Sequence, residues 1–274
     1  MPELPEVETT LRGIKPHLHK AVISKLVVRN RFLRWPVPDK QLLKLVNQRI
    51  VSIERRAKYL LFGTQVGTIL LHLGMSGSLR VLKKDIPPGK HDHIDIELNG
   101  FKILRYNDPR RFGCCLLIKP CEEISQHKLL VSLGPEPLSD AFTAEHLYKL
   151  SRNRKMPIKN FIMDGNIVVG VGNIYASESL FMAGIRPTVA AGRISRVRYQ
   201  RLALEIQQVL SKAIDAGGTT LSDFSQVDGK PGYFKQELKV YGRDGEPCFR
   251  CDTKIKSMTI GQRNTFYCRS CQKF

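Results

Sequence analysis

The second and third residues, Pro2 and Glu3, are of types that can work together as a nucleophile and a proton donor. Removal of the initiator methionine would expose Pro2 as a secondary α-amine, and an α-amine has a reference pKa of about 8 against about 10.4 for lysine. The unprotonated amine can attack a carbon atom and form an iminium, while a neighbouring carboxyl moves the proton. The pair therefore indicates covalent amine catalysis, and an ordinary helix start is the alternative.

A helix is expected directly after this pair. Pro5 suits the first helical turn, and Glu6 and Glu8 complement the positive end of the helix dipole. Apolar residues recur at helical spacing in the following turns, namely Val7, Leu11, Ile14 and Leu18. We expect an amphipathic helix that docks on a core and anchors the amine, with Glu6 as a carboxylate that holds the amine end.

Four cysteines near the carboxyl end have the spacing of a metal site. Cys248 and Cys251 form one Cys-x2-Cys pair, and Cys268 and Cys271 form the second pair, with sixteen residues between the pairs. Two such pairs predict a tetrahedral four-thiolate site for one Zn2+ ion. The ion is structural, because four protein ligands leave no open position for a substrate. A hairpin stapled by the metal can present the intervening cations, including Arg263, to phosphates.

The composition favours a polyanionic partner. The 274 residues include 44 Lys and Arg against 25 Asp and Glu, and the formal net charge of +19 is spread along the chain. A membrane surface is the alternative, but we find no lipid-anchor motif, signal peptide or apolar run of about 18 residues. Nucleic acid is therefore the expected partner. A reducing cytoplasm fits the three remaining cysteines, Cys114, Cys115 and Cys121.

Residues 21–118 are expected to form β-structure, because short apolar runs are separated by Gly, Pro, Asn and Asp turns. Ile94, Ile96 and Leu98 alternate with Asp95 and Glu97, which predicts a sheet with one solvated face. The spacing of the runs predicts a β-sandwich. The runs are Val22–Val28, Ile50–Phe62, Thr68–Leu73, Leu79–Leu82, Ile94–Leu98, Ile103–Tyr106 and Cys114–Ile118.

A linker at 133–138 separates this part from a helical part. Helices are expected at 143–152, 157–164, 174–184 and 195–216. The expected fold class is therefore α+β with several domains. The domains are an amino-terminal β-sandwich with a leading helix at 1–130, a helical domain at 131–235 and a four-cysteine module at 236–274.

Two loops of the helical part can contact a ligand. The residues Gly170-Val171-Gly172-Asn173 lead into a helix with Asn173 at the expected N-cap, where backbone N–H groups can bind an anion. A plain connection between helices is the alternative. Residues 217–233 form a long glycine-rich loop, and loops of this length in compact domains are usually functional or disordered.

Three turns and strands of the sandwich carry side chains that can act on DNA. In RRAKYL (55–60), a strand would place Arg56 and Lys58 on one face. Each cation would then lower the pKa of the other, so that Lys58 can move protons. A solvated basic strand is the alternative. HLGMSG (72–77) and DPRRFG (108–113) place Met75 and Phe112 on glycine-bounded turns. Such side chains can fill the gap left by a flipped base, or they are residues at the rim of the core.

These motifs together resemble the formamidopyrimidine-DNA glycosylases, the bacterial 8-oxoguanine glycosylases that also cleave abasic sites. The resemblance covers essentially the whole chain. It rests on PELPEVE (2–8), RRAKYL, HLGMSG, KHDH (90–93), DPRRFG, GVGNIYASESL (170–180), QELKVYGR (236–243) and the four cysteines.

The resemblance implies a base-excision repair enzyme that removes oxidised purines from double-stranded DNA through a Schiff base and then cleaves the strand by β,δ-elimination. It implies a helix-two-turn-helix domain at 131–235, in which the loop 217–233 reads the lesion, and a zinc finger at 236–274. The implied catalytic residues are Pro2, Glu3, Lys58 as the acid of the β-elimination, and Arg263 in the second elimination. The implied DNA contacts are His91, Arg110, Lys155 and Asn173, with Met75, Arg110 and Phe112 as the wedge.

Two other functions stay open on the sequence. An endonuclease VIII-like glycosylase would perform the same chemistry on oxidised pyrimidines, and a non-catalytic zinc-ribbon protein would bind nucleic acid with the same charge and cysteines. The PELPEVE start, the wedge residues and the long loop favour the purine enzyme, and a binder gives no reason for Pro2 and Glu3. We expect a monomeric enzyme of the bacterial cytoplasm, associated with the nucleoid, that needs no cofactor besides zinc.

Overall fold

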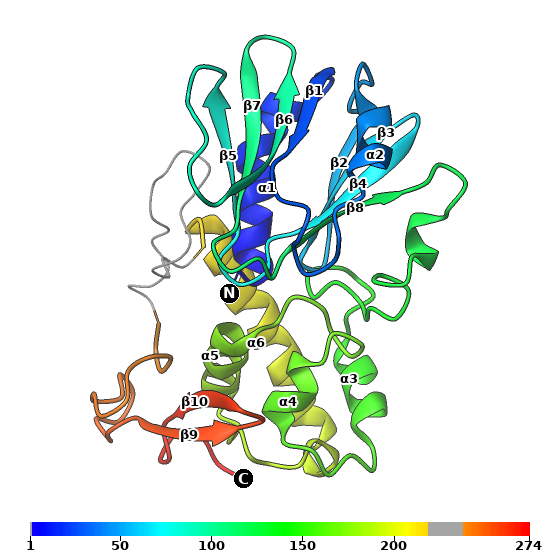
Figure 1. Cartoon of the computed structure of the whole chain (residues 1–274). Coiled ribbons are helices and arrows are strands. Elements are labelled where there is room, and N and C mark those ends of the chain that lie inside the picture. Colours follow the sequence, from blue (N-terminus) through cyan, green and yellow to red (C-terminus); the bar gives the residue numbers. More distant parts are fainter. Residues whose placement is uncertain (1, 219–237) are drawn as a thin grey trace. The chain divides into compact units, whose positions relative to one another are not determined.

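The computed structural model describes residues 2–218 and 238–274, and the chain divides into two units. Unit 1 comprises residues 1–131 and 216–235, and unit 2 comprises residues 132–215 and 236–274. Most of the loop predicted at 217–233 lies outside the described residues. Both units are labelled by element in Figure 1.

Unit 1 is the predicted β-sandwich, with two antiparallel sheets of four strands each. The first sheet has the strand order β1 (Ile23–Val28), β6 (Asp92–Leu98), β7 (Lys102–Asn107) and β5 (Ser78–Lys83). The second has the order β2 (Ser52–Arg56), β3 (Tyr59–Thr64), β4 (Gly67–His72) and β8 (Cys114–Ile118). Short helical segments not expected from the sequence follow β1 and β8, namely α2 (Asp39–Leu42), η1 (Leu43–Leu45) and η2 (Ile124–Gln126).

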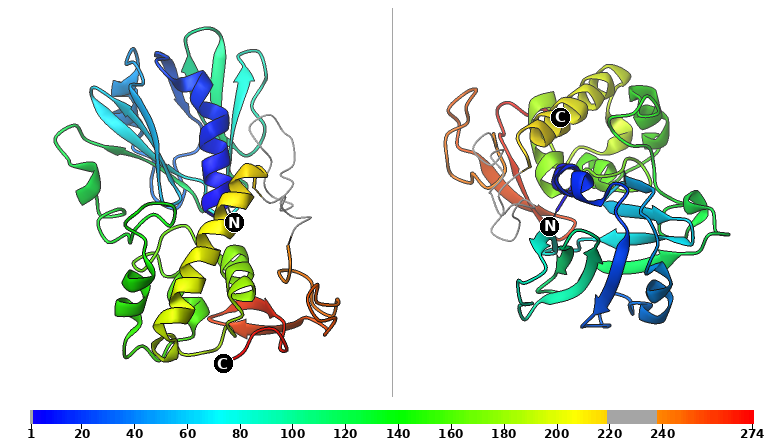
Figure 2. Two further views of the ribbon diagram at one scale, coloured as in Figure 1. Left: turned by 180° about the vertical axis from the view of Figure 1, so that it is seen from behind. Right: turned by 90° about the horizontal axis from the view of Figure 1, so that it is seen from above.

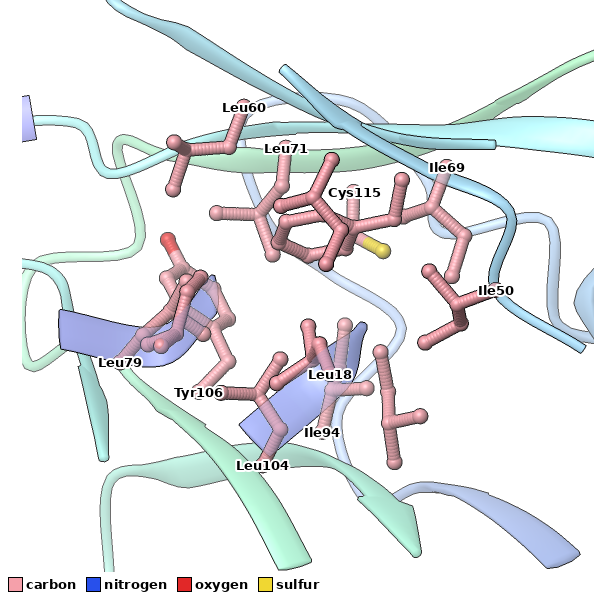
Figure 3. Close-up of a cluster of buried hydrophobic side chains, with 14 of the residues drawn as sticks. Leu18, Ile50, Leu60, Ile69, Leu71, Leu79, Ile94, Leu104, Tyr106 and Cys115 are labelled. Atoms are coloured by element: carbon pink, nitrogen blue, oxygen red, sulfur yellow. The ribbon is translucent and has the colours of Figure 1, made fainter. Parts of the chain in front are cut away.

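The leading helix α1 (Leu4–Leu18) packs on both sheets of the sandwich, as the rear view in Figure 2 shows. Its apolar stripe of Val7, Leu11, Ile14 and Leu18 is buried in the core, as the spacing predicted. Leu18 and side chains from both sheets meet between the layers in Figure 3, where Leu71 comes from β4. Burial of each such side chain contributes about 1.5 to 3 kcal/mol relative to exposure, so this core holds α1 and its amino end in place.

Two expectations for the strands are wrong. The run Ile50–Phe62 is not one strand, because Ala57 adopts a φ of +54° and a two-residue turn separates β2 from β3. The sheet face of Asp95 is not solvated either, since Asp95 is only 2% exposed and Glu97 only 7%. Arg105 of the neighbouring strand β7 donates to Asp95 from Nε and from Nη2, each at 2.9 Å, so paired charges replace solvent on this face.

Unit 2 contains four α-helices in its described part, and each was expected within a few residues. They are α3 (Ala144–Ser151), α4 (Ile158–Met163), α5 (Asn173–Ala183) and α6 (Arg196–Asp215), with a short turn η3 (Ala191–Arg193). α6 packs on α3 and α5, and the hairpin of β9 (Lys256–Ile260) and β10 (Arg263–Tyr267) lies against α5 (Figure 1). Among the described residues, no helix is both long and apolar enough to cross a membrane.

Candidate functional site

Pro2 and Glu3 are both buried at the start of α1. Glu3 is the N-cap residue, and its side chain accepts from the backbone N–H of Glu6. In return the backbone N–H of Glu3 donates to Oε2 of Glu6 at 2.8 Å. This reciprocal capping box satisfies two backbone donors that a helix start leaves unpaired. It fixes the backbone beside Pro2, which is the contact expected of Glu6.

The start of the long glycine-rich loop lies against the same carboxylate. Gly218 has a φ of +82°, and a Cβ placed on it would lie 3.3 Å from Oε1 of Glu6. A side chain at this position would be strained and crowded, so glycine is required where the chain passes Glu6. The first described residues of the loop are therefore held next to the amino end of α1.

Lys58 lies in the turn between β2 and β3, so its predicted place on one strand face with Arg56 is wrong. The structure instead brings Lys58 near His72, whose ring lies 5.0 Å from the ring of Tyr59. Burial, together with the charges of Lys58 and Arg34, lowers the pKa of His72 to about 4. Nδ1 of His72 accepts from the N–H of Gly74 at 2.9 Å, so Nε2 carries the proton in the neutral ring.

His72 is a candidate that the sequence reasoning missed. It is the first residue of HLGMSG, but a histidine at the end of a strand carries no signal of its pKa or its neighbours. In the structure it is a neutral hydrogen-bond donor at neutral pH beside a lysine. Such a pair can bind an anionic oxygen through one charged and one neutral donor.

The turns 72–77 and 108–113, called the paired turns below, are packed together. A Cβ on Gly74 would lie 2.4 Å from the backbone nitrogen of Gly113, so only glycine permits this approach. Met75 is half-buried, whereas Phe112 is 46% exposed and lies under the guanidinium of Arg110 at 5.0 Å. The structure therefore brings the three predicted wedge residues onto one pair of turns. The exposure of Phe112 disfavours the alternative that it belongs to the core rim.

His91 lies in a turn joined to the second of the paired turns. Its carbonyl oxygen accepts from the backbone N–H of Asp108 at 3.0 Å. The ring of His91 is half-buried and lies 6.5 Å from the ring of His93. Four predicted DNA-contacting residues of unit 1 thus sit on three connected turns.

In unit 2, Asn173 is the first residue of α5 and not its N-cap, which is Gly172. The side chain of Asn173 instead joins the helix start to the hairpin, because its Nδ2 donates to the carbonyl of Asn264 at 3.0 Å. Asn264 follows Arg263, an exposed residue at the start of β10. The predicted phosphate contacts Asn173 and Arg263 are therefore brought together.

A buried lysine holds this junction, and it is not the one expected. Nζ of Lys159 donates to Oδ1 of Asn173 at 2.6 Å and to Oγ1 of Thr265 at 2.5 Å. Lys159 has no solvent exposure, whereas Lys155 is exposed ahead of α4. The role of Lys155 in phosphate binding stays a prediction. Lys159 was missed because its partners are distant in sequence, although a lysine within the expected helix 157–164 is a weak signal.

The four predicted metal ligands converge in unit 2. All their sulfur atoms lie within 4.8 Å of one another. The Sγ atoms of Cys251 and Cys268 are 3.5 Å apart, and those of Cys248 and Cys271 are 3.9 Å apart. Four thiolates about 2.3 Å from a central Zn2+ ion would be separated by about 3.8 Å, so the donor set fits one tetrahedral zinc ion. The four cysteines form a structural zinc site.

Family models match most of the chain. The model of the formamidopyrimidine-DNA glycosylase N-terminal domain matches residues 1–115, and that of the H2TH domain of the same glycosylase matches residues 133–225. The model of a zinc finger found in FPG and IleRS matches residues 245–273. A sandwich, a helical H2TH domain and a four-cysteine finger together define a class of zinc-containing DNA glycosylases. The chain belongs to the formamidopyrimidine-DNA glycosylase family.

Known proteins are similar over the full length. The formamidopyrimidine-DNA glycosylase of a Pseudomonas putida strain is 57% identical over 274 residues, which cover 100% of both chains. The formamidopyrimidine-DNA glycosylase of Alteromonas mediterranea is 58% identical over 273 residues, which also cover 100% of both chains. The crystal structure of the MutM (Fpg) protein of Thermus thermophilus is 34% identical with a TM-score of 0.88, covering 99% of this chain and 98% of that one. The complex of Lactococcus lactis Fpg with abasic-site DNA is 31% identical with a TM-score of 0.91, covering 99% and 100%.

Proposed function

We propose that this chain is a bifunctional DNA glycosylase and abasic-site lyase of base-excision repair, which removes 8-oxoguanine and formamidopyrimidines from duplex DNA. The observation that carries the proposal is the buried pair Pro2 and Glu3, fixed by a capping box at the start of a helix that is docked on the core. The family relationship supports it, as does the complex of a Lactococcus lactis Fpg variant with DNA that contains Fapy-dG.

In the proposed reaction the Pro2 nitrogen attacks C1′ of the damaged nucleotide, and the bond to the base breaks. Glu3 protonates the sugar ring oxygen, so the ring opens and a Schiff base forms. The cationic nitrogen acidifies the proton at C2′, and its loss expels the 3′ phosphate in β-elimination, for which Lys58 is the acid. A second elimination at the 5′ side, assisted by Arg263, leaves a one-nucleotide gap.

The DNA contacts divide between the two units. In unit 1 the paired turns supply Met75, Arg110 and Phe112 to fill the space of the flipped base, and His91 binds a backbone phosphate. In unit 2 the phosphate contacts are Asn173, Arg263 and Lys155. A net charge of +19 supports such binding.

The remaining assignments follow from this function. We divide the enzyme into a catalytic sandwich at 1–130, an H2TH domain with the lesion-recognition loop at 131–235 and a zinc finger at 236–274. We also propose that the enzyme is a monomer and acts in the bacterial cytoplasm at the nucleoid, where free thiols such as Cys114 and Cys115 stay reduced.

Borohydride trapping tests the proposed function. The chain is incubated with a duplex that contains 8-oxoguanine opposite cytosine, reduced, and digested for mass spectrometry; the expected product is DNA bound to the amino-terminal peptide through Pro2. An undamaged duplex of the same sequence is the control and should give no adduct. Excision without an adduct would contradict the amine mechanism, and the absence of both excision and adduct on the 8-oxoguanine duplex would contradict the substrate class.

A further inference from the structure

Asp108 is a buried carboxylate at the centre of the three connected turns of unit 1. It has no solvent exposure. Its Oδ1 accepts from the hydroxyl of Ser76 at 3.1 Å, in the first of the paired turns. Its Oδ2 accepts from the backbone N–H of Gly113 at 2.9 Å, in the second of the paired turns. One side chain therefore bonds both turns that carry the wedge residues.

The backbone of Asp108 extends these links to the third turn. Its N–H donates to the carbonyl of His91 at 3.0 Å, and its carbonyl oxygen is 2.8 Å from Nε2 of His93. The carbonyl also accepts from the N–H of Arg111 at 3.2 Å, and Arg111 has a φ of +57°. The turn that presents Arg110 and Phe112 is thus closed on Asp108 itself.

A third donor completes the environment of the carboxylate. The hydroxyl of Tyr106 donates to Oδ2 at 3.0 Å, and Tyr106 is a core residue between the two sheets in Figure 3. A buried carboxylate is costly unless hydrogen bonds replace its water, and here three donors do so. The carboxylate of Asp108 therefore joins the paired turns to the core, because all three donors bond to this one group.

We propose that Asp108 is a positioning residue that locks the paired turns into one rigid wedge, so that Met75, Arg110 and Phe112 enter the duplex together. The inference rests on the proposed function, because the wedge acts on DNA. A wedge matters most when the base to be extruded is paired and stacked, since extrusion costs least for a mismatched or unpaired base. The contribution of Asp108 should therefore depend on the substrate and not only on the enzyme.

Single-turnover rates on matched substrates test this, measured as base excision for the two duplexes that carry 8-oxoguanine and as strand cleavage for the preformed abasic site. Asp108→Asn keeps the shape of the side chain but loses one acceptor oxygen. Ser76→Ala removes only the hydrogen bond to the turn that carries Met75. Asp85→Asn changes an exposed aspartate of the same unit and is the control. The substrates carry 8-oxoguanine opposite cytosine, 8-oxoguanine opposite an abasic analogue, and a preformed abasic site. A 2-aminopurine beside the lesion reports unstacking, and thermal unfolding reports the fold.

For Asp108→Asn we expect about a tenfold slower excision opposite cytosine, but a loss of about twofold or less for the two substrates in which extrusion is already cheap. Ser76→Ala should show the same order of substrates with a smaller loss, a delayed 2-aminopurine signal and an unchanged unfolding temperature. Asp85→Asn should match the wild type.

Equal losses on all three substrates, or no loss in a folded Asp108→Asn protein, would overturn the inference. If Asp108→Asn does not fold, Ser76→Ala decides the question by the same ratios. The proposed function is tested separately, because excision of 8-oxoguanine and formation of the Pro2 adduct are both measured on the wild-type chain.

Discussion

His72 shows how the surroundings of one side chain set its chemistry. His72 is the last residue of β4, and burial together with the charges of Lys58 and Arg34 lowers its pKa from 6.5 to about 4. At neutral pH it is therefore an uncharged donor beside a cation, and it does not add to the repulsion around Lys58. This arrangement favours the proton transfer proposed for Lys58.

The lowered pKa predicts a pH dependence of stability. The unfolded chain takes up a proton at His72 as the pH falls below 6.5 and the folded chain does so only near pH 4, so acid favours unfolding within this window. The free energy of unfolding should fall by about 2 kcal/mol between about pH 7 and about pH 5 on account of His72. Urea unfolding of His72→Asn, which keeps an acceptor for Gly74, should lack this decrease.

The exposed His19 provides the matched control. His19→Asn should retain the full decrease over the same pH range. Burial alone would raise the pKa of Asp95, but hydrogen bonds from Arg105 and Arg29 outweigh it and hold that pKa low. That carboxylate loses its stabilising charge only below its ordinary pKa of 3.8, outside the window measured. An unchanged pH dependence in His72→Asn would contradict the assignment.

The two lysines near α4 should differ in how they affect DNA binding. Lys159→Met removes the ammonium that joins Asn173 to Thr265, so affinity for an abasic-analogue duplex should fall about tenfold, equivalent to about 1.4 kcal/mol. The salt dependence of this affinity should change little, because Lys159 is buried and would not contact a phosphate directly. Lys155→Met should instead reduce the slope of log K against log salt by about 0.9 if Lys155 binds a phosphate. Fluorescence anisotropy over a salt series measures both quantities, and the reverse pattern would exchange the two roles.

Arg263 gives a third test at the residue scale. It is exposed at the start of β10, and Arg263→Ala should lower the salt slope by about 0.9 as one phosphate contact is lost. Arg269→Ala changes another exposed arginine of the finger and is the control. Unchanged slope and affinity in Arg263→Ala would remove Arg263 from the DNA contacts.

At the scale of elements, periodicity and spacing predicted most of the fold. The strands from Val22–Val28 to Cys114–Ile118 and the helices of unit 2 follow from apolar periods that depend only on neighbouring residues. The cysteine pairs likewise predicted the metal site. These features are local, so the sequence alone displays them.

Features that depend on distant partners were not predictable. Asp95 was expected to face solvent from its local alternation with apolar residues. One of its partners, Arg29, is 66 residues away, so the local pattern does not show this ion pair. The turn at Lys58 has Ala57 at positive φ, where glycine or asparagine is the usual signal. Lys159 meets Thr265 across 106 residues. In each case a partner from another element or an unusual backbone angle determined the outcome, and neither is visible in the local sequence.

The zinc finger is anchored to α5 by more than its metal. The carboxylate of Glu178 in α5 accepts from the backbone N–H groups of Lys239, Val240 and Tyr241 at 2.8 to 3.0 Å. Phe181 of α5 shares an apolar cluster with Cys248 and other residues of the finger. Burial raises the pKa of Glu178, which the three donors partly oppose. The segment after residue 237 is therefore fixed to the helix that begins at Asn173.

Loss of a zinc ligand should disable the finger and spare the sandwich. Cys268→Ser removes one thiolate, and because ordering of such short modules is driven by the metal, DNA binding and incision should be abolished. The circular dichroism of the sandwich should persist. Cys121→Ser changes an exposed cysteine of unit 1 and should keep one zinc per chain and full incision. Full activity in a Cys268→Ser protein that metal analysis finds zinc-free would contradict this prediction.

For the whole molecule, the proposed function makes the amino terminus irreplaceable. In that function the nucleophile is a secondary amine that exists only when Pro2 is the first residue, and both Pro2 and Glu3 are buried at the start of α1. An uncleaved tag, or retention of Met1, converts the amine into a tertiary amide that cannot form an iminium. The proposed phosphate contacts and the proposed wedge do not depend on that amine.

A protein with an uncleaved amino-terminal tag should therefore lose both base excision and strand cleavage while it binds an abasic-analogue duplex with the affinity of the untagged chain. The same tag with a protease site that leaves Pro2 first is the matched control and should regain both activities on cleavage. Gel assays of excision and anisotropy of binding measure the two properties on one preparation. Lys58→Ala should behave differently again, because it slows elimination but leaves Pro2 available for trapping. Intact excision in the tagged protein, or a wild-type adduct that maps to Lys58, would show that another amine is the nucleophile.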